Sequence, residues 1–164
     1  GSDSEIFFWN GTTTQQITGN IYNEYTPQIS GNNVVWYGQG GSDGGSDLEI
    51  FLWNGDTTQQ ITVNENYDII PQISGSNVVW QGLGGSDGGS DSEIFFWNGT
   101  AARQITENDN DEYVPQISGN NIVWYGQGGS DGGSDSEIFF WNGSSTQQIT
   151  ENDGGDYSPQ ISRQ

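Results

Sequence analysis

Acidic residues at a regular spacing are the side chains of this sequence best suited to chemistry. Residues 40–49 read Gly-Gly-Ser-Asp-Gly-Gly-Ser-Asp-Leu-Glu, and close copies return at 84–93 and 128–137. Carboxylates on a glycine-rich backbone suit a hard cation, because calcium accepts about 6–8 oxygen ligands in loose geometry. The candidate calcium ligands are three acids from each segment: Asp43, Asp47, Glu49, Asp87, Asp91, Glu93, Asp131, Asp135 and Glu137.

The spacing Asp-x3-Asp-x-Glu matches neither the EF-hand loop nor the Gly-Gly-x-Gly-x-Asp repeat of β-rolls. The alternative interpretation is a solvated linker whose charge keeps a repetitive chain soluble. A fourth acid recurs at a matching position of each repeat, as Glu24, Asp68, Glu112 and Asp156, and Asp3 with Glu5 are a remnant of a further copy.

Several kinds of catalysis are excluded by composition. The chain contains no His, Cys or Lys, so it has no residues for a Ser-His-Asp or Cys-His triad, a Schiff base or a zinc cluster. Catalysis by two carboxylates needs a pair whose environments separate their pKa values. The acids here repeat on loops that we expect to be exposed and nearly identical, so we do not expect an enzyme.

Net charge narrows the set of partners. The 164 residues include 22 acidic residues and two Arg, giving a formal charge of −20. Binding to phosphates scales with the number of Lys and Arg, so we expect neither nucleic acid nor an anionic membrane surface as a partner. No apolar run approaches the ~20 residues of a membrane-spanning helix, so we expect no membrane insertion.

The sequence consists of near-identical copies of one 44-residue unit. Ser-Asp-Ser-Glu-Ile-Phe-Phe-Trp-Asn-Gly begins at Ser2, Ser90 and Ser134, with a variant at Ser46. Pro-Gln-Ile-Ser returns with the same period and contains all four prolines. Such identity indicates recent amplification of one structural unit.

Each unit predicts four short strands. In the first complete unit they cover 27–30, 33–37, 49–53 and 57–62, with Asn54-Gly55 as a tight hairpin turn. The second and third strands are continuously apolar, which indicates a sheet covered on both faces. A four-stranded antiparallel sheet repeated every ~40–45 residues is the blade of a β-propeller. A β-sandwich is the alternative, but it does not explain a strict period.

The residues 27–36, 49–55 and 60–62 resemble the TolB-type and WD40-like propeller repeats in their order. That resemblance implies an apolar second strand, an Ile-Tyr-type third strand, a turn at Asp-Gly or Asn-Gly, and a closing Leu-Thr. It extends over the whole chain and implies blade geometry, not a ligand site. The turn after the first strand and the longer loop before the third depart from the family pattern.

The order of the units predicts an all-β propeller of about 3¾ blades with a split, permuted closing blade. Residues 1–18 are expected to form strands three and four of that blade, and 159–164 its first strand. Full blades are expected at 27–62, 71–106 and 115–150. Because an unpaired strand edge invites pairing, we expect chains to associate with one another. A monomeric four-bladed ring with a defective closing blade is the alternative.

The charges are expected to gather on one rim of the propeller. In a blade, the two long connections leave on one rim and the two tight turns on the other. On this basis 21 of the 22 acids lie at the long-loop rim, with Asp56 in a tight turn. Arg103 and Arg163 both fall towards the opposite rim.

Two function classes follow. The first is a structural module, outside the cell or on its surface, that assembles with itself into rings or fibres. The second is a multivalent binding module for carbohydrate or a cationic partner, with calcium on the acidic loops. Every Trp lies in an apolar strand, which favours packing between blades over stacking on a sugar.

Overall fold

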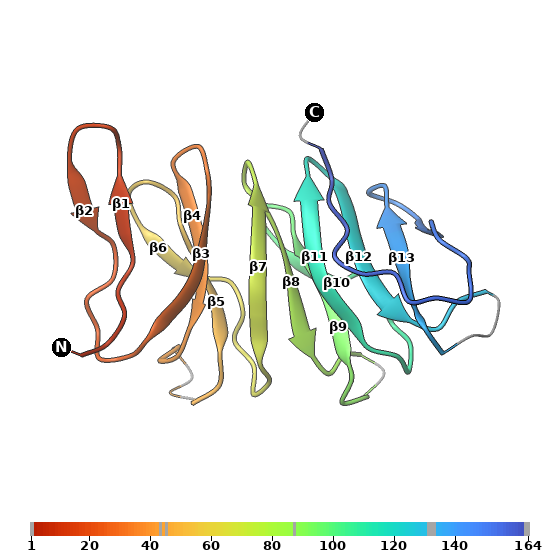
Figure 1. Cartoon of the computed structure of the whole chain (residues 1–164). Coiled ribbons are helices and arrows are strands. Elements are labelled where there is room, and N and C mark those ends of the chain that lie inside the picture. The colour runs from red at the N-terminus through yellow and green to blue at the C-terminus, as the bar shows by residue number, and fades with distance from the viewer. Residues whose placement is uncertain (1, 43, 45, 87, 131–133, 163–164) are drawn as a thin grey trace.

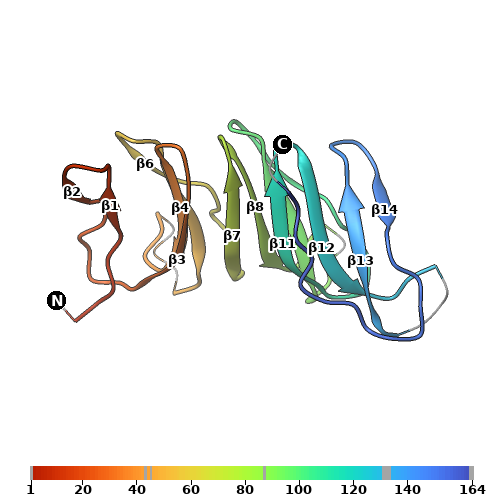
Figure 2. The ribbon, with the colours of Figure 1, turned by 45° about the horizontal axis from the view of Figure 1, so that its top comes forward.

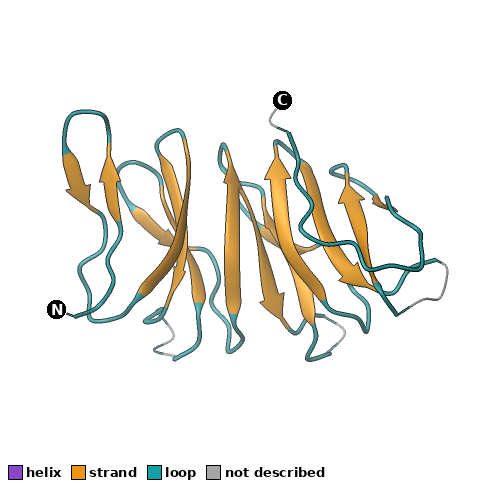
Figure 3. Ribbon diagram, in the orientation of Figure 1, coloured by secondary structure: helices purple, strands orange, loops and turns teal. Residues whose placement is uncertain are grey.

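The computed structural model describes residues 2–42, 44, 46–86, 88–130 and 134–162. Those residues form three four-stranded antiparallel sheets and one hairpin (Figures 1 and 3). The hairpin is β1 (Phe7–Trp9) and β2 (Thr14–Gln16). The three sheets comprise the following strands in order: β3 (Glu24–Ser30), β4 (Asn33–Gly38), β5 (Glu49–Trp53) and β6 (Thr58–Gln60); β7 (Asp68–Ser74), β8 (Asn77–Leu83), β9 (Ser92–Trp97) and β10 (Ala102–Gln104); β11 (Glu112–Ser118), β12 (Asn121–Gln127), β13 (Ser136–Trp141) and β14 (Thr146–Gln148).

The sheets stand side by side in chain order and do not close into a ring. The hairpin lies at one end of the row and the β11–β14 sheet at the other, in both orientations of the ribbon (Figures 1 and 2). Each sheet is a simple meander in which consecutive strands are neighbours. The fold is therefore the all-β architecture expected from the sequence, a partial propeller of four-stranded antiparallel blades. Within the described residues there is no helix that could cross a membrane.

The inner strands begin three residues earlier than predicted. β3, β7 and β11 start at an acid, and Pro lies in the middle of each strand. The register shifts between Tyr25 and Gln28, and the residue before Pro has a positive φ, such as 41° at Thr26. A bulge takes the proline nitrogen out of the hydrogen-bonded ladder, so Pro is tolerated there. The predicted blade starts at 27, 71 and 115 are wrong for this reason.

The C-terminal segment 159–162 forms no strand in the described chain. Gln160 and Ile161 nevertheless line a pocket of about 380 Å³ together with the ends of the inner strands β3, β7 and β11. The segment thus lies beside the inner strands, on the side of the sheets where a first strand is expected.

The cores lie between neighbouring sheets. Val35, Ile50 and Leu52 of one sheet pack against Trp80 and Trp97 of the next. The following interface repeats this arrangement, and the hairpin packs in the same way on β4 and β5. Six of the seven Trp are buried in these interfaces, which confirms that they pack between blades.

Hydrogen bonds join neighbouring sheets at the inner turns. The Gly75 N–H donates to the Ser30 hydroxyl at 2.9 Å, and the Asn33 amide donates to the Gly75 carbonyl at 2.7 Å. Gly119 makes the same bonds with Ser74 and Asn77. Successive blades are therefore fixed by one repeated contact as well as by apolar packing.

Candidate functional site

Pairs of acids meet where one blade passes to the next, and we call each such place an acidic junction. The junctions pair an acid at the start of a third strand with the acid that opens the next inner strand. A backbone hydrogen bond joins the two ends of the connection between the acids. At the second junction, for example, the Asp68 N–H donates to the Leu48 carbonyl at 2.7 Å. The four pairs are Glu5 with Glu24, Glu49 with Asp68, Glu93 with Glu112, and Glu137 with Asp156.

Most of these acids are buried, and the expectation that they lie on exposed loops is wrong. Glu49, Glu93 and Glu137 are no more than 1% exposed, and Glu24, Asp68 and Glu112 are also buried. The reason is their register. Each is part of a strand that is covered by the neighbouring sheet or by the connection to it, so its side chain is enclosed at the end of the core.

A Thr and an Asn from the intervening connection hold each pair in place. At the second junction, the Thr62 side chain is hydrogen-bonded to both Glu49 and Asp68. The Asn64 N–H donates to Glu49 at 3.0 Å, and its amide donates to Asp68 at 2.8 Å. Equivalent residues bond to the acids of the other junctions. Thr18 and Asn20 donate to Glu24, and Asn108 donates to Glu93 and Glu112 beside Thr106, whose side chain is also bonded to Glu112. Thr150 donates to Glu137, and Asn152 donates to both Glu137 and Asp156.

Sequence reasoning missed these Thr and Asn residues. Their signal was present as the tetrapeptide Ile-Thr-x-Asn, which recurs with the 44-residue period from Ile17 onward. By itself this tetrapeptide predicts only the end of a fourth strand. Its contribution to the junctions depends on a chain reversal that local pattern does not reveal.

Several buried carboxylate oxygens face no hydrogen-bond donor. They are one oxygen each of Glu5, Asp47, Glu49, Asp91, Glu93, Glu112 and Asp135. Besides burial, the adjacent Glu93 raises the pKa of the Glu112 carboxyl group, and Glu5 does the same to Glu24. A protonated carboxyl group can donate a hydrogen bond to a neighbouring carboxylate, whereas two carboxylates only repel each other. These two junctions therefore favour a bound proton or another cation.

Burial raises the pKa of four junction acids, Glu24, Glu49, Asp68 and Glu112. The pKa of Glu49 rises to about 7 and that of Asp68 to about 6, in both cases mainly because burial disfavours the charged form. Burial, and then the adjacent Glu93, raise the pKa of Glu112 well above its usual range. At neutral pH the Glu93–Glu112 pair therefore holds a proton.

The predicted calcium ligands are brought together only in part. Asp43, Asp87 and Asp131 lie outside the described residues. Asp47, Asp91 and Asp135 are half-buried beside the junctions, and Glu49, Glu93 and Glu137 belong to them. Among the described residues, no group of three or more acids is arranged to hold a metal ion. The junctions offer two carboxylates with hydroxyl and amide oxygens nearby, which is fewer acids than the sequence predicted.

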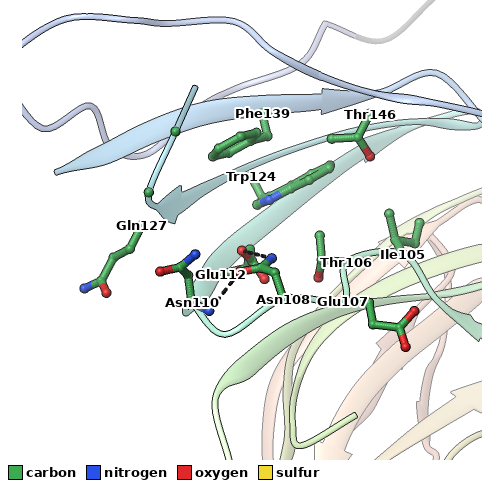
Figure 4. A pocket seen from close by; sticks show the side chains of 12 residues that line it. Ile105, Thr106, Glu107, Asn108, Asn110, Glu112, Trp124, Gln127, Phe139 and Thr146 are labelled. Atoms are coloured by element: carbon green, nitrogen blue, oxygen red, sulfur yellow. Dashed lines mark hydrogen bonds between the residues drawn. The ribbon is translucent and has the colours of Figure 1, made fainter. Parts of the chain in front are cut away.

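A recess opens beside the third junction (Figure 4). Its volume is about 380 Å³, and Glu112, Asn108, Asn110, Trp124 and Phe139 line it. The Trp124 indole N–H has no partner there, whereas the equivalent Trp80 N–H donates to Asp68 at 2.7 Å. The rings of both Trp are almost fully buried, so neither offers a free face to a sugar.

Arg103, the one basic residue among the described residues, lies at the tight-turn rim. Arg103 donates to the Gly143 carbonyl at 3.3 Å, within the hairpin turn of the next blade. Its guanidinium lies 4.5 Å from the centre of the Trp141 ring. The predicted position of Arg103 is confirmed, and Arg163 lies outside the described residues.

Comparisons with known proteins identify the fold. No family model and no curated protein matches the sequence. The β-propeller domain of the Trilobed protease from Pyrococcus furiosus, which has an open velcro topology, is similar in structure, with a TM-score of 0.70 at 13% identity. The Pyrococcus horikoshii acylaminoacyl peptidase gives 0.68 at 14%, and a putative TolB from Agrobacterium tumefaciens gives 0.56 at 16%.

These similarities cover 90%, 90% and 89% of this chain, respectively. The chain itself spans 45%, 22% and 56% of the matched chains. At such low identity the likeness concerns the fold alone. The chain is thus a partial β-propeller that shares its blade architecture with protease propeller domains and a TolB-like protein.

Proposed function

We propose that the chain is a non-catalytic propeller scaffold that associates with further copies of itself through the two ends of its blade row. The proposal is supported by one observation above all. The two ends of the row expose the two complementary halves of the interface that holds its interior together.

The hairpin end exposes the first half. Trp9 is 60% exposed and Phe7 is 58% exposed. The equivalent Trp53 packs on Phe8 of the preceding unit, with ring centres 5.1 Å apart, and Trp141 packs on Phe96 at 5.4 Å. Trp9 therefore presents the surface that, everywhere else in the molecule, is covered by the blade before it.

The other end exposes the second half. Phe140 stands in the repeat where Phe8 and Phe96 stand, and it is only half-buried. Ile149 is 52% exposed, whereas the equivalent Ile105 packs against the next interface. This surface is equivalent to the surfaces that cover Trp53 and Trp141 inside the row, and no such surface covers Trp9. An interface between unlike ends is head-to-tail, so repeated association gives a ring if it closes and a fibre if it does not.

The hairpin also has a free strand edge in the described structure. β1 pairs with β2 alone, while β5, β9 and β13 each have a second strand on their inner side. Ile29, beside this gap, is 51% exposed. An edge of this kind accepts an added strand, so a further copy of the repeat can complete the hairpin as a blade. Because most positions of the blades repeat the same residues, we extend the proposal to a structural role outside the cell or on its surface.

The test is the particle mass in solution. Multi-angle light scattering over a range of concentrations should give multiples of 17.9 kDa. Trp9→Glu should shift the distribution towards the single chain. The control is Ile21→Glu, since Ile21 is 84% exposed in the connection between β2 and β3, where the other copies have the acids Glu65, Asp109 and Asp153. A 17.9 kDa particle at every concentration would overturn the proposal.

A second candidate function is multivalent cation binding at the junctions, with calcium as the ion. The observation that favours it is the set of buried oxygens without a donor, which a cation could neutralise in place of a proton. Calorimetric titration at pH 8 should then show saturable calcium binding that is weaker at pH 5 and reduced by Glu93→Gln. Absence of saturable heat at both pH values would remove this candidate.

A further inference from the structure

Five residues of two adjacent blades depart from the repeat and meet in space. Leu48, just before β5, stands where the other copies have Ser, and Tyr67, just before β7, stands where they have Asn, Asp or Gly. Ile69 and Gln81 stand where the other copies have Tyr, and Leu83 where they have Gln. These five residues, with Gly82, line a groove of about 310 Å³ at the acidic rim.

The neighbouring blades show what the groove replaces. Tyr25 and Tyr37 pair across β3 and β4 with their rings stacked 5.3 Å apart. Tyr113 and Tyr125 form the same pair between β11 and β12, also at 5.3 Å. Ile69 and Gln81 are the matching pair between β7 and β8. Two stacked rings are therefore replaced by smaller side chains, and this exchange opens the groove.

The polar groups of the groove walls are already bonded to the protein. The Gln81 amide donates to the Ser92 hydroxyl at 3.2 Å and accepts from the Val114 N–H at 3.4 Å. The Leu83 N–H donates to the Tyr67 carbonyl at 2.9 Å. The surface left to a ligand is thus apolar and is held in place before anything binds. Tyr67 is 48% exposed and Leu83 is 37% exposed, so the groove is open to solvent.

The charge around the groove is negative. Asp47 directly precedes Leu48, and Asp111 accepts a hydrogen bond from the backbone of Ser92 at 2.8 Å. The backbone carbonyl of Asp91 accepts from the Gly84 N–H at 2.9 Å, which places this acid just beyond Leu83. Arg103 lies at the opposite rim, beside the Gly143 turn. A second copy of this chain also has a formal charge of −20, so we expect it to be repelled from this rim.

We propose that this groove binds one apolar side chain of an extended polypeptide segment rich in Lys and Arg. The apolar walls take the side chain, and the surrounding carboxylates take the flanking positive charges. All of the groove's lining residues come from one chain, so the site is independent of how chains associate.

The test uses a synthetic peptide, acetyl-Lys-Arg-Leu-Trp-Arg-Lys-amide, titrated into the isotope-labelled chain and followed by NMR. The amide signals of 67–69 and 81–83 should shift with a micromolar dissociation constant. Ile69→Tyr with Gln81→Tyr should weaken binding at least tenfold, because it restores the ring pair of the neighbouring blades. This double variant uses residues that the fold already accommodates, and Leu83→Gln is a second, milder variant with the same expected direction.

Two control peptides separate the contributions. One replaces Leu-Trp by Ser-Ser and keeps the charge, and the other replaces the basic residues by Glu and keeps the apolar pair. Both should bind at least tenfold more weakly. Equal binding of the Ser-Ser peptide, or unchanged binding by the filled-groove variant, would show only a general attraction to the acidic rim and overturn the proposal. Equal binding of the acidic peptide would overturn the cationic partner.

Discussion

Trp9 and Trp53 occupy the same position of the repeat and have opposite environments. Trp9 is 60% exposed, whereas Trp53 is 4% exposed. Their local sequences are nearly identical, Ile-Phe-Phe-Trp-Asn-Gly and Ile-Phe-Leu-Trp-Asn-Gly. The difference arises from the preceding blade, which covers Trp53 and is missing beside Trp9. In this molecule burial is a property of the interface between blades, not of the motif within one.

Removing an interior Trp should have the largest effect. Trp97→Ala deletes a ring from the interface between the β3–β6 and β7–β10 sheets, and we expect a loss of about 3–5 kcal/mol in the free energy of unfolding. Trp9→Ala should cost less than about 1 kcal/mol, because that ring is already largely in water. Urea denaturation followed by far-UV circular dichroism, at concentrations where the chain is monomeric, measures both values. Equal losses would contradict the comparison.

The acidic junctions can also be compared between the interior of the blade row and its end. Thr106 accepts a hydrogen bond from the buried Ile94 N–H at 2.8 Å and is hydrogen-bonded to Glu112. Thr106→Val keeps the shape but leaves these groups without a partner, at a cost of about 1–3 kcal/mol. Thr150 makes the same bond to Ile138, also at 2.8 Å, in the half-exposed junction at the end of the row. Thr150→Val should cost less, since water can replace the hydroxyl there, and urea denaturation of the pair compares them.

Stability should fall as pH rises, because interior junctions bury acids. The pKa of Glu49 is raised from 4.5 to about 7, and that of Asp68 from 3.8 to about 6. The folded chain therefore keeps protons that the unfolded chain has released. For each acid, the stabilisation is fully present below the pKa of the unfolded chain. It is lost as the pH rises through the pKa of the folded chain.

We expect the free energy of unfolding to decrease between pH 4 and pH 7, by on the order of 1 kcal/mol for each such group. Denaturation curves at several pH values measure this slope. Glu49→Gln should flatten it, whereas Asp56→Asn, in an exposed tight turn, controls for the loss of one negative charge. A stability that increases with pH in both proteins would contradict the burial of these acids.

The sequence predicted the parts of the fold that depend on short segments and on the period. The Asn54-Gly55 turn, the apolar second and third strands and their repetition were enough to indicate blades. The environment of Glu49 was not predictable in this way, because its partners Thr62, Asn64 and Asp68 come from a connection that reverses direction. The strand start at Glu24 was missed because a bulge lets the strand continue back past Pro27.

Arg103 gives the smallest and most local comparison between blades. It stands where the other copies have Gln15, Gln59 and Gln147. Its guanidinium lies over the rings of Trp141 and Phe96, at 4.5 and 5.5 Å from their centres. Restoring the repeat with Arg103→Gln should cost about 0.5–1 kcal/mol, the usual size of an exposed cation–π contact. Because the rings carry no net charge, this loss should persist in 0.5 M NaCl, where an effect of Arg103 on the distant acidic rim would be screened. Denaturation at low and high salt distinguishes the two, and a loss confined to low salt would assign the effect to the net charge instead.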